Sequence, residues 1–413
     1  MLGTGTAPSR FAPGQRLRLT LGEMGALGEC RAEVEGLPIW VFGGIPQEEV
    51  VAEVVRWRRT YAAARVVEVV CPSPHRVTPP CPYFWPCTGC QWQHIAYPYQ
   101  LHLKRHLVRK ALATVDALAD VPVQETLPSP QIWGYRNHAR MTIGPQGKVG
   151  FVNRTTREFV PIDACLLMHP WINQALAHLQ GKCAETSQMS IRYGVHTGQW
   201  LIQPPLHEPS ITLATGQKYY EEALWGRRFR IASPSFFQVN TLQAEQMVRV
   251  VRDALGLNGQ GILVDAYAGV GTFGILLAPF VTRVIAIEES ASAVDDARIN
   301  AQGIPNIEFR QGKVEEVLPT LETHPDAVIV DPPRRGCHPE ALHTLNRLAI
   351  PRLMYVSCDL EALVRDLTHL VKGPYRVVWV QPVDMFPHTH HIECLALLVR
   401  KDAVGSSPQG DRA

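Results

Sequence analysis

The pattern of apolar and polar positions changes twice along the chain and predicts three parts. Over residues 12–70, short apolar runs at 16–21, 39–42, 49–55 and 64–70 alternate with glycine-containing turns. Short runs at this spacing are typical of a small closed β-barrel of about five strands. Residues 1–11 are expected to form a flexible N-terminus ahead of it.

A segment rich in proline and cysteine, from Cys71 to Cys90, interrupts this pattern and indicates a domain boundary. Beyond it, residues 98–118 carry apolar side chains at helical spacing, and residues 134–230 form a strand-rich stretch of mixed order. We therefore expect a mixed central domain over residues 71–232, whose topology the pattern does not predict.

After Phe236 apolar strands alternate with helices, which predicts an α/β domain with a parallel sheet over residues 233–401. The expected strands are 261–265, 283–288, 307–311, 327–331, 353–357, 375–380 and 392–399. No helix separates the last two, so we expect them to pair antiparallel. Residues 402–413 are polar and are expected to form a disordered tail.

Composition narrows the class of protein only a little. The chain has 413 residues, of which 46% are hydrophobic and 19% charged, as in ordinary globular proteins. No apolar run reaches the ~18 residues of a membrane span, and the start lacks the order of a signal peptide. We expect a cytoplasmic protein without membrane contact.

The net charge of +2 is too small to indicate nucleic-acid binding by itself. Four local clusters do mix cations with rings, as phosphate contact and base stacking require. They are residues 56–59, 104–110, 136–140 and 227–230. Solvated surface faces are the simpler alternative for any one of them.

Residues 262–274 read as a buried strand, a glycine-rich turn and the start of a helix. Gly269, Gly271 and Thr272 are candidate cofactor-binding residues, because glycines let the backbone pass close to a ligand. Glu288, at the end of the next strand, would hold ribose hydroxyls. This pattern suits a dinucleotide as well as S-adenosylmethionine.

Two aspartates favour S-adenosylmethionine. Asp265 stands just before the turn, and Asp331 opens the sequence Asp-Pro-Pro-Arg at the end of the fourth strand. Cofactor and substrate would then meet at the carboxyl edge of the sheet. Cys358 ends the next strand at this edge, and Glu393 follows a polar stretch at the start of the last strand. By position alone, Cys358 would more often be an inert buried thiol.

Ten cysteines in a chain without an export signal favour metal binding or catalysis over disulfides. Cys81, Cys87 and Cys90 lie in a turn-forming segment that would direct three thiolates to one point. Three thiolates usually need a fourth ligand. The spacing alone leaves zinc and an iron-sulfur cluster equally open.

From Phe236 to Arg400 the chain resembles the RNA 5-methyluridine (uracil-C5) methyltransferases. The motifs that carry the resemblance, in the order of the family, are residues 236–240, the loop 265–274, and residues 331–336, 355–358, 365–367 and 384–393. The resemblance implies a Rossmann-like methyltransferase domain that uses S-adenosylmethionine. It implies Cys358 as nucleophile and Glu393 as proton-abstracting base, with contacts around cofactor and target base from Gln238, Tyr267, Glu288 and Asp331.

The chemistry explains why such an enzyme needs one thiol and one carboxylate. Uracil C5 is too weak a nucleophile to attack a sulfonium methyl unaided. A thiolate that adds at C6 makes C5 enolate-like, and a base must later remove the C5 proton so that the thiol can leave.

The resemblance extends to the front of the chain. Residues 14–70 are similar to the TRAM domain, a small RNA-binding barrel of the OB-like kind. Cys165 matches the remote fourth ligand in the cluster-bearing branch of the family. The resemblance therefore implies a 4Fe-4S site at Cys81, Cys87, Cys90 and Cys165, structural or RNA-positioning in role, with zinc as the alternative.

Two positions depart from the family pattern. Asp359 and Leu360 stand where Asn-Pro usually follows the nucleophile, which would alter the stiffness of the loop. Lys313 replaces an Asn or acidic residue, which puts one cofactor contact in doubt.

Three other functions stay open on the sequence. An adenine-N6 methyltransferase would use the Asp-Pro-Pro motif without a thiol, and a cytosine-C5 enzyme would use Cys337 as nucleophile. The third is an RNA-binding cluster protein without catalysis.

The sequence does not identify the RNA. We favour 23S ribosomal RNA over the tRNA T-loop and expect a monomer. A uracil in paired RNA would have to be flipped out of its stack or supplied in a loop. Candidate stacking residues, which core packing would equally explain, are Trp57, Tyr83, Phe84, Trp85 and Trp92.

Overall fold

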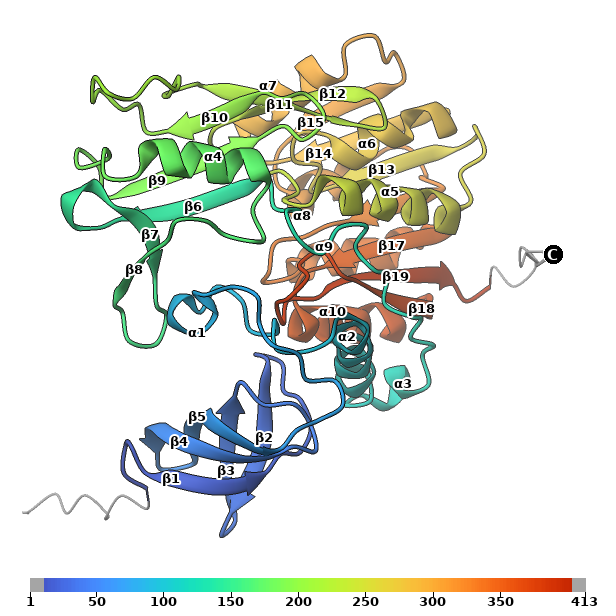
Figure 1. Cartoon of the computed structure of the whole chain (residues 1–413). Coiled ribbons are helices and arrows are strands. Elements are labelled where there is room, and N and C mark those ends of the chain that lie inside the picture. Colours follow the sequence, from blue (N-terminus) through green and yellow to red (C-terminus); the bar gives the residue numbers. More distant parts are fainter. Residues whose placement is uncertain (1–10, 403–413) are drawn as a thin grey trace, which may run out of the picture. The chain divides into compact units, whose positions relative to one another are not determined.

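The computed structural model describes residues 11–402, which form two compact units (Figure 1). The first contains residues 11–107 and 387–391, and the second contains residues 108–386 and 392–402. The predicted domain boundaries at residues 70 and 232 stay predictions. The flexible N-terminus and the disordered tail fall almost wholly outside the described residues.

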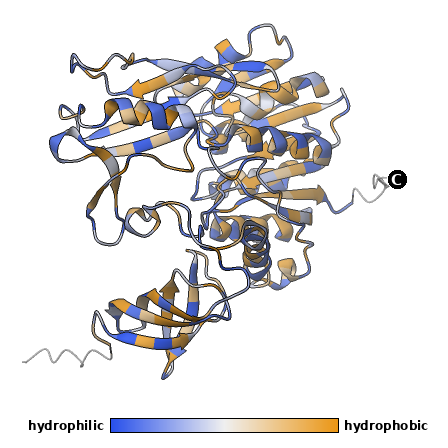
Figure 2. Ribbon diagram, viewed as in Figure 1, coloured by the Kyte–Doolittle hydropathy of each residue, from blue (hydrophilic) through white to orange (hydrophobic). Residues whose placement is uncertain are grey.

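Five strands of the first unit form one sheet in the order β1-β4-β5-β3-β2. They are β1 (Arg16–Thr20), β2 (Glu29–Val34), β3 (Leu37–Phe42), β4 (Glu49–Arg58) and β5 (Tyr61–Cys71). Buried and more exposed residues alternate along β3 and the first half of β4, as on a sheet with one buried face. Figure 2 shows the same alternation of hydropathy along these strands.

A buried ion pair ties the segment after β5 back to this sheet. Glu48 is fully buried, and its two carboxylate oxygens accept hydrogen bonds from Arg76 at 2.5 and 2.6 Å. The backbone N–H groups of Ile45 and Ser73 donate to the same carboxylate. The ion pair and these hydrogen bonds offset much of the free-energy cost of removing the Glu48 charge from water. The helices α1 (Phe84–Cys87) and α2 (Tyr97–Leu112) follow.

The second unit opens with short elements and two small sheets. One sheet has the order β10-β9-β6-β7-β8, and β11 and β12 form a separate hairpin. The elements are α3 (Asp116–Ala119), β6 (His138–Ile143), η1 (Pro145–Gly147), β7 (Val149–Val152), β8 (Phe159–Pro161), α4 (Pro170–Leu179), β9 (Gln188–Tyr193), β10 (Trp200–Gln203), β11 (Tyr219–Leu224) and β12 (Arg227–Ala232).

A seven-stranded sheet dominates the second unit, in the order β15-β14-β13-β16-β17-β19-β18. Its strands are β13 (Ile262–Ala266), β14 (Arg283–Glu288), β15 (Ile307–Gln311), β16 (Ala327–Val330), β17 (Arg352–Ser357), β18 (Tyr375–Val383) and β19 (Glu393–Arg400). The first five are parallel, and β19 pairs antiparallel with both β17 and β18. The predicted α/β fold and the antiparallel final pair are confirmed.

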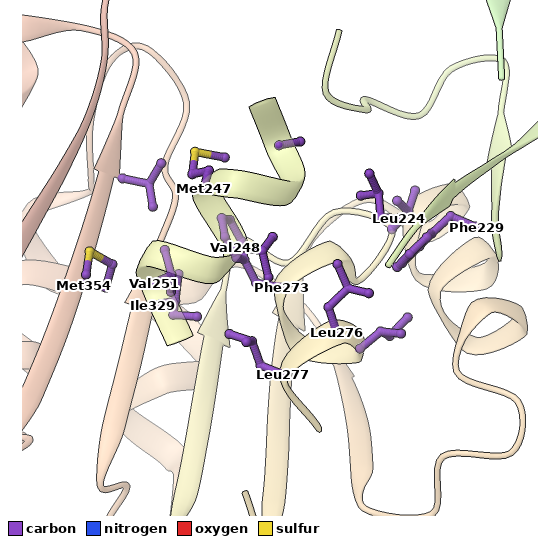
Figure 3. Packing of buried hydrophobic residues seen from close by; sticks show 14 of the residues in the cluster. Leu224, Phe229, Met247, Val248, Val251, Phe273, Leu276, Leu277, Ile329 and Met354 are labelled. Atoms are coloured by element: carbon purple, nitrogen blue, oxygen red, sulfur yellow. The ribbon is translucent and has the colours of Figure 1, made fainter. Parts of the chain in front are cut away.

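Helices flank this sheet and pack apolar side chains against it. They are α5 (Thr241–Leu255), α6 (Thr272–Leu277), α7 (Ala291–Asn300), α8 (Val314–Val317), α9 (Pro339–Leu348) and α10 (Leu360–Lys372), with short 3-10 turns at 278–280 and 318–320. Figure 3 shows side chains of α5 and α6 packed with Ile329 and Met354 of the sheet. Among residues 11–402, no helix is both long and apolar enough to cross a membrane.

The core at α6 predicts a clear stability difference between two aliphatic residues. Leu277 is fully buried in the main cluster, whereas Ile299 on α7 is 38% exposed. We expect Leu277→Ala to lower the free energy of unfolding by about 2–5 kcal/mol, because it leaves a cavity. Ile299→Ala should change it by at most about 0.5 kcal/mol. Urea unfolding followed by circular dichroism measures both, and equal losses would contradict the packing described.

Candidate active site

The glycine-rich loop between β13 and α6 is held from below by a buried carboxylate. Asp265 is fully buried, and its Oδ2 accepts a hydrogen bond of 2.7 Å from the backbone N–H of Gly274. A Cβ at Gly274 would come within 3.0 Å of that oxygen. Gly271 has φ 86°, a left-handed conformation that favours glycine. The loop therefore depends on glycine at both positions.

Glu288 and Tyr267 fix the rest of the loop. The carboxylate of Glu288, at the end of β14, accepts hydrogen bonds from the N–H groups of Gly269 at 2.9 Å and Ser290 at 2.7 Å. Tyr267 has φ 65°, which is strained for a residue with a side chain. Its half-buried ring reaches Cys337, and burial raises the pKa of its phenol. Thr272 is the first residue of α6.

The electrostatics of this edge favour a cationic ligand. Burial, together with the charges of Asp331 and Glu288, raises the pKa of Asp265 to about 7, against the effect of the hydrogen bond from Gly274. Burial also raises the pKa of Asp331 to about 7. Carboxylates gathered at one edge attract a positively charged group and repel a pyrophosphate. The loop therefore fits the sulfonium of S-adenosylmethionine better than a dinucleotide.

Cys358 and Glu393 come together through the pairing of β17 with β19. The register pairs Ser357 with Cys394. Cys358, which follows β17, therefore lies beside Glu393, the first residue of β19. Cys358 is partly exposed, while Glu393 is only 7% exposed. The predicted nucleophile and the predicted base thus share one end of a rigid strand pair.

Burial and nearby charges set the ionisation of this pair. Burial raises the pKa of Cys358 to about 11, the carboxylates of Glu393 and Asp331 oppose its ionisation, and the Arg334 guanidinium favours it. Burial also holds the pKa of Glu393 well above its ordinary value, with Asp331 acting in the same direction and Arg334 against it. Arg334 lies in the Asp-Pro-Pro-Arg motif, but its effect on the pKa values of Cys358 and Glu393 was not predicted from the sequence.

Cys337, the alternative candidate nucleophile, is more buried than Cys358. It is 6% exposed, and burial raises the pKa of its thiol to about 12. Its sulfur lies 3.8 Å from the hydroxyl of Tyr355. A thiol enclosed in this way is a poor nucleophile. This disfavours the cytosine-C5 alternative.

The segment that carries Gln238 is anchored by two asparagines. The Asn137 amide donates to the backbone oxygen of Gln238 at 3.0 Å. Asn240 begins α5 as its N-cap and donates to the backbone oxygen of Met385 at 3.3 Å. Phe236, two residues before Gln238, is 70% exposed, which is unusual for a large apolar ring. The exposure of the Phe236 ring was not predicted, because the motif at residues 236–240 does not indicate which of its side chains are buried.

The two departures from the family pattern have different structural settings. Asp359 is the N-cap of α10, where its Oδ1 accepts a hydrogen bond of 2.9 Å from the N–H of Ala362. The loop after Cys358 therefore gains its stiffness from a helix cap. Lys313 precedes α8 and lies 3.8 Å from Glu316.

The four cysteines of the predicted cluster do not appear as a metal centre. Among residues 11–402, no group of three or more His, Cys, Asp or Glu side chains stands in an arrangement that would hold a metal. Cys81, Cys87 and Cys90 belong to the first unit and Cys165 to the second, and all four are partly exposed. Four thiols suit either metal chemically, but the described geometry does not show the site.

The basic cluster at 227–230 is largely engaged within the protein. Arg227 donates to the backbone oxygen of Asn300, Arg228 lies 2.8 Å from Glu221, and Arg230 lies 3.2 Å from Asp296. Among the candidate stacking residues, Trp92 is fully buried and Phe84 is 5% exposed, so both are core residues. Trp85 is 54% exposed, and Trp57 and Tyr83 are intermediate.

Comparison with known proteins adds independent evidence. A family model described as tRNA (Uracil-5-)-methyltransferase matches residues 213–401. An uncharacterized RNA methyltransferase of Gloeobacter violaceus is 33% identical over 97% of this chain and 100% of its own. Another, from Thermosynechococcus vestitus, is 34% identical over 94% and 99%.

One solved structure is similar over almost the whole chain. It is the Pyrococcus abyssi tRNA (uracil-54, C5)-methyltransferase in complex with S-adenosyl-L-homocysteine, with a TM-score of 0.75 and 28% identity. The match covers 93% of this chain and 100% of that one.

The fold and the edge site define an S-adenosylmethionine-dependent methyltransferase. With the relatives above, the chain belongs to the RNA (uracil-5-)-methyltransferase family. The family resemblance seen in the sequence motifs is therefore confirmed.

The raised pKa of Cys358 predicts how its alkylation depends on pH. Iodoacetamide reacts with the thiolate, whose population rises with pH until the pKa is passed. We expect the rate at Cys358 to rise about tenfold per pH unit from about pH 7 to about pH 10. Peptide mapping by mass spectrometry follows Cys358, with buried Cys337 as the unreactive control. A plateau near about pH 8.5, the value of an ordinary cysteine, would contradict this environment.

Proposed function

We propose that the protein transfers a methyl group from S-adenosylmethionine to C5 of a uridine in RNA, through a covalent bond between Cys358 and C6. The observation that carries the proposal is the meeting of Cys358 and Glu393 at the sheet edge, near the carboxylate-lined loop. A thiol and a buried carboxylate side by side are the two groups that this chemistry requires.

The steps follow from the two residues. The Cys358 thiolate adds to C6, and the displaced electron pair makes C5 an enolate-like nucleophile. When bound, S-adenosylmethionine would supply the methyl group to C5; its S–CH3 bond would break with the electron pair left on sulfur, which gives S-adenosylhomocysteine as the leaving group. The Glu393 carboxylate then takes the proton from C5, the C5–C6 double bond reforms, and the C6–S bond breaks to restore the thiolate.

The electrostatics support these roles. Arg334 is the positive charge that favours the Cys358 thiolate, against the effects of burial and of two carboxylates. A carboxylate whose pKa is raised by burial is a stronger base than an exposed one, which suits Glu393 to abstraction of a carbon-bound proton.

The residues proposed to hold cofactor and base surround this pair. Gly269, Gly271 and Thr272 would line the cofactor beside Glu288, and Tyr267 would contribute its ring. Gln238 and Asp331 are also proposed to bind the cofactor, with contacts that extend to the target base. The exposed ring of Phe236 is a further candidate to stack on it, because an exposed aromatic face is suited to a nucleobase.

Ribosomal RNA is the substrate that the sequence analysis favours, specifically 23S rRNA. A second candidate is a tRNA uridine, because the similar solved structure is that of a tRNA (uracil-54, C5)-methyltransferase. In either RNA the base must be unstacked before C6 is reached. Monomeric state and cytoplasmic location stay predictions.

Substitution of the two active-site residues separates this mechanism from its rivals. Cys358→Ala should abolish methyl transfer from labelled S-adenosylmethionine to unmodified rRNA and tRNA, because no adduct can form. Cys337→Ala should retain it. Digestion of the RNA to nucleosides should place the label in 5-methyluridine. Loss of activity in Cys337→Ala alone, or label in another nucleoside, would overturn the mechanism.

Removal of the base should trap the intermediate. Glu393→Gln cannot take the C5 proton, so the methylated adduct should accumulate as a protein–RNA complex that survives denaturing electrophoresis. The double variant with Cys358→Ala is the control and should give no such complex. Fast turnover in Glu393→Gln would show that another group is the base.

We also propose that Cys81, Cys87, Cys90 and Cys165 bind a 4Fe-4S cluster, with zinc as the alternative. The support is the thiol donor set and the family resemblance, and no step of methyl transfer is routed through the group. Anaerobically purified protein should contain about four iron and four sulfide, with visible thiolate-to-iron absorbance. Cys165→Ser should lose it. Stoichiometric zinc without that absorbance would decide for the alternative.

A further inference from the structure

The turn that carries Arg334 is fixed at both ends. At its start, the N–H of Asp331 donates to the backbone oxygen of Ala266 at 3.3 Å. Within it, the N–H of Gly336 donates to the backbone oxygen of Pro333 at 2.7 Å, so Arg334 and Arg335 are the two central residues of the turn. Arg334 is exposed, so side-chain burial does not hold it in place.

The far end of the turn rests on one buried carboxylate. Asp366 on α10 is fully buried, and its Oδ2 accepts hydrogen bonds from the N–H of Cys337 at 2.7 Å and the hydroxyl of Tyr355 at 2.5 Å. Its Oδ1 accepts from Arg365 at 2.8 Å. Three donors thus satisfy both oxygens of this buried carboxylate.

Arg365 extends this support to the turn itself. While bound to Asp366, it also donates to the backbone oxygen of Arg335 at 2.6 Å. Gly336, with φ 78°, lies directly against both side chains, because a Cβ there would come within 2.2 Å of Arg365 Nη2 and 2.5 Å of Asp366 Oδ2. Asp366 and Arg365 thus grip the turn at two consecutive peptide groups, those on either side of Gly336.

We propose that Asp366, acting with Arg365, is a positioning residue that holds the Arg334 turn so that its guanidinium faces Cys358 and Glu393. The inference rests on the proposed function in that Cys358 is the nucleophile whose ionisation Arg334 assists. Asp366 does not touch substrate or cofactor in this scheme. It acts through the backbone of Cys337 and the turn before it.

The test measures the ionisation of Cys358 directly. The charged and titratable groups that act on it are Glu393 and Cys394 on β19, and Asp331 and Arg334 on the turn segment. If Asp366→Asn releases Arg334, the other groups stay and the thiolate becomes less favoured. We expect the iodoacetamide rate at Cys358, at about pH 9, to fall about tenfold, which is one unit of pKa.

A double-mutant cycle separates positioning from general damage. Arg334→Gln should give the full loss of alkylation rate, and Asp366→Asn added to it should cause no further loss. Equal rates in Asp366→Asn and the parent protein, or additive losses in the double variant, would overturn the proposal. Methyl transfer by Asp366→Asn should fall about tenfold in parallel.

Two further variants keep the test decisive if Asp366→Asn is unstable. Arg365→Gln removes the bond to Arg335 from a side chain that is 58% exposed, so it should fold and show a smaller loss in the same direction. Asp326→Asn is the matched control: its carboxylate also accepts a backbone N–H at 2.7 Å, from Ile262, but at the opposite edge of the sheet. It should leave alkylation unchanged.

The alkylation readout does not require methyl transfer. Activity retained in Cys358→Ala would defeat the proposed function and leave the Asp366 result standing. An unchanged alkylation rate in Asp366→Asn and Arg365→Gln would defeat the positioning inference alone.

Discussion

The antiparallel pairing of β19 with β17 is the constraint on which the site depends. Cys358 and Glu393 are far apart in sequence, and only the register that pairs Ser357 with Cys394 brings them to one end of the sheet. A shift of β19 by one residue would turn Glu393 to the opposite face of the sheet. Because β19 is hydrogen-bonded on both sides, by β17 and β18, such a shift would break two ladders at once.

The same edge combines rigid and adjustable parts. Cys358 and Glu393, the proposed nucleophile and base, lie at the ends of strands whose residues are mostly buried, whereas the loops after β13 and β16 are held by a few side chains. Asp265 and Glu288 hold the first loop, and Asp366 holds the second. Each is a carboxylate that accepts a backbone N–H. The sheet thus fixes where Cys358 and Glu393 lie, and buried or half-buried carboxylates fix the conformations of the loops beside them.

The α/β domain was predictable from sequence because four of its five parallel strands are largely buried. Such strands read as continuous apolar runs, as at β13 and β16, and all seven strands begin within a residue of the predicted position. β2 was not predicted, since Glu29, Arg31 and Glu33 alternate with its apolar residues. The order of β6 to β10 was also beyond reach, because short strands that pair across distant segments leave no periodic signal.

For the site, the sequence motifs predicted which side chains would react, but not the burial, charges and hydrogen bonds that act on them. The positions of Cys358, Glu393 and the glycine loop at one edge follow from strand ends alone. The charge of Arg334, the burial of Cys337 and the grip of Asp366 depend on contacts between loops, which spacing along the chain does not encode. The predicted cysteine cluster stays a prediction, since its four residues are divided between the two units.

The high pKa of Cys358 also has a chemical consequence outside catalysis. Peroxides and other oxidants attack thiolates far faster than thiols, and oxidation to the sulfinic acid is in general irreversible. Burial and two neighbouring carboxylates raise the pKa of Cys358, the proposed nucleophile, so we expect it to be oxidised more slowly than an ordinary thiol. The surroundings that make the sulfur slow to ionise thus also extend its working lifetime.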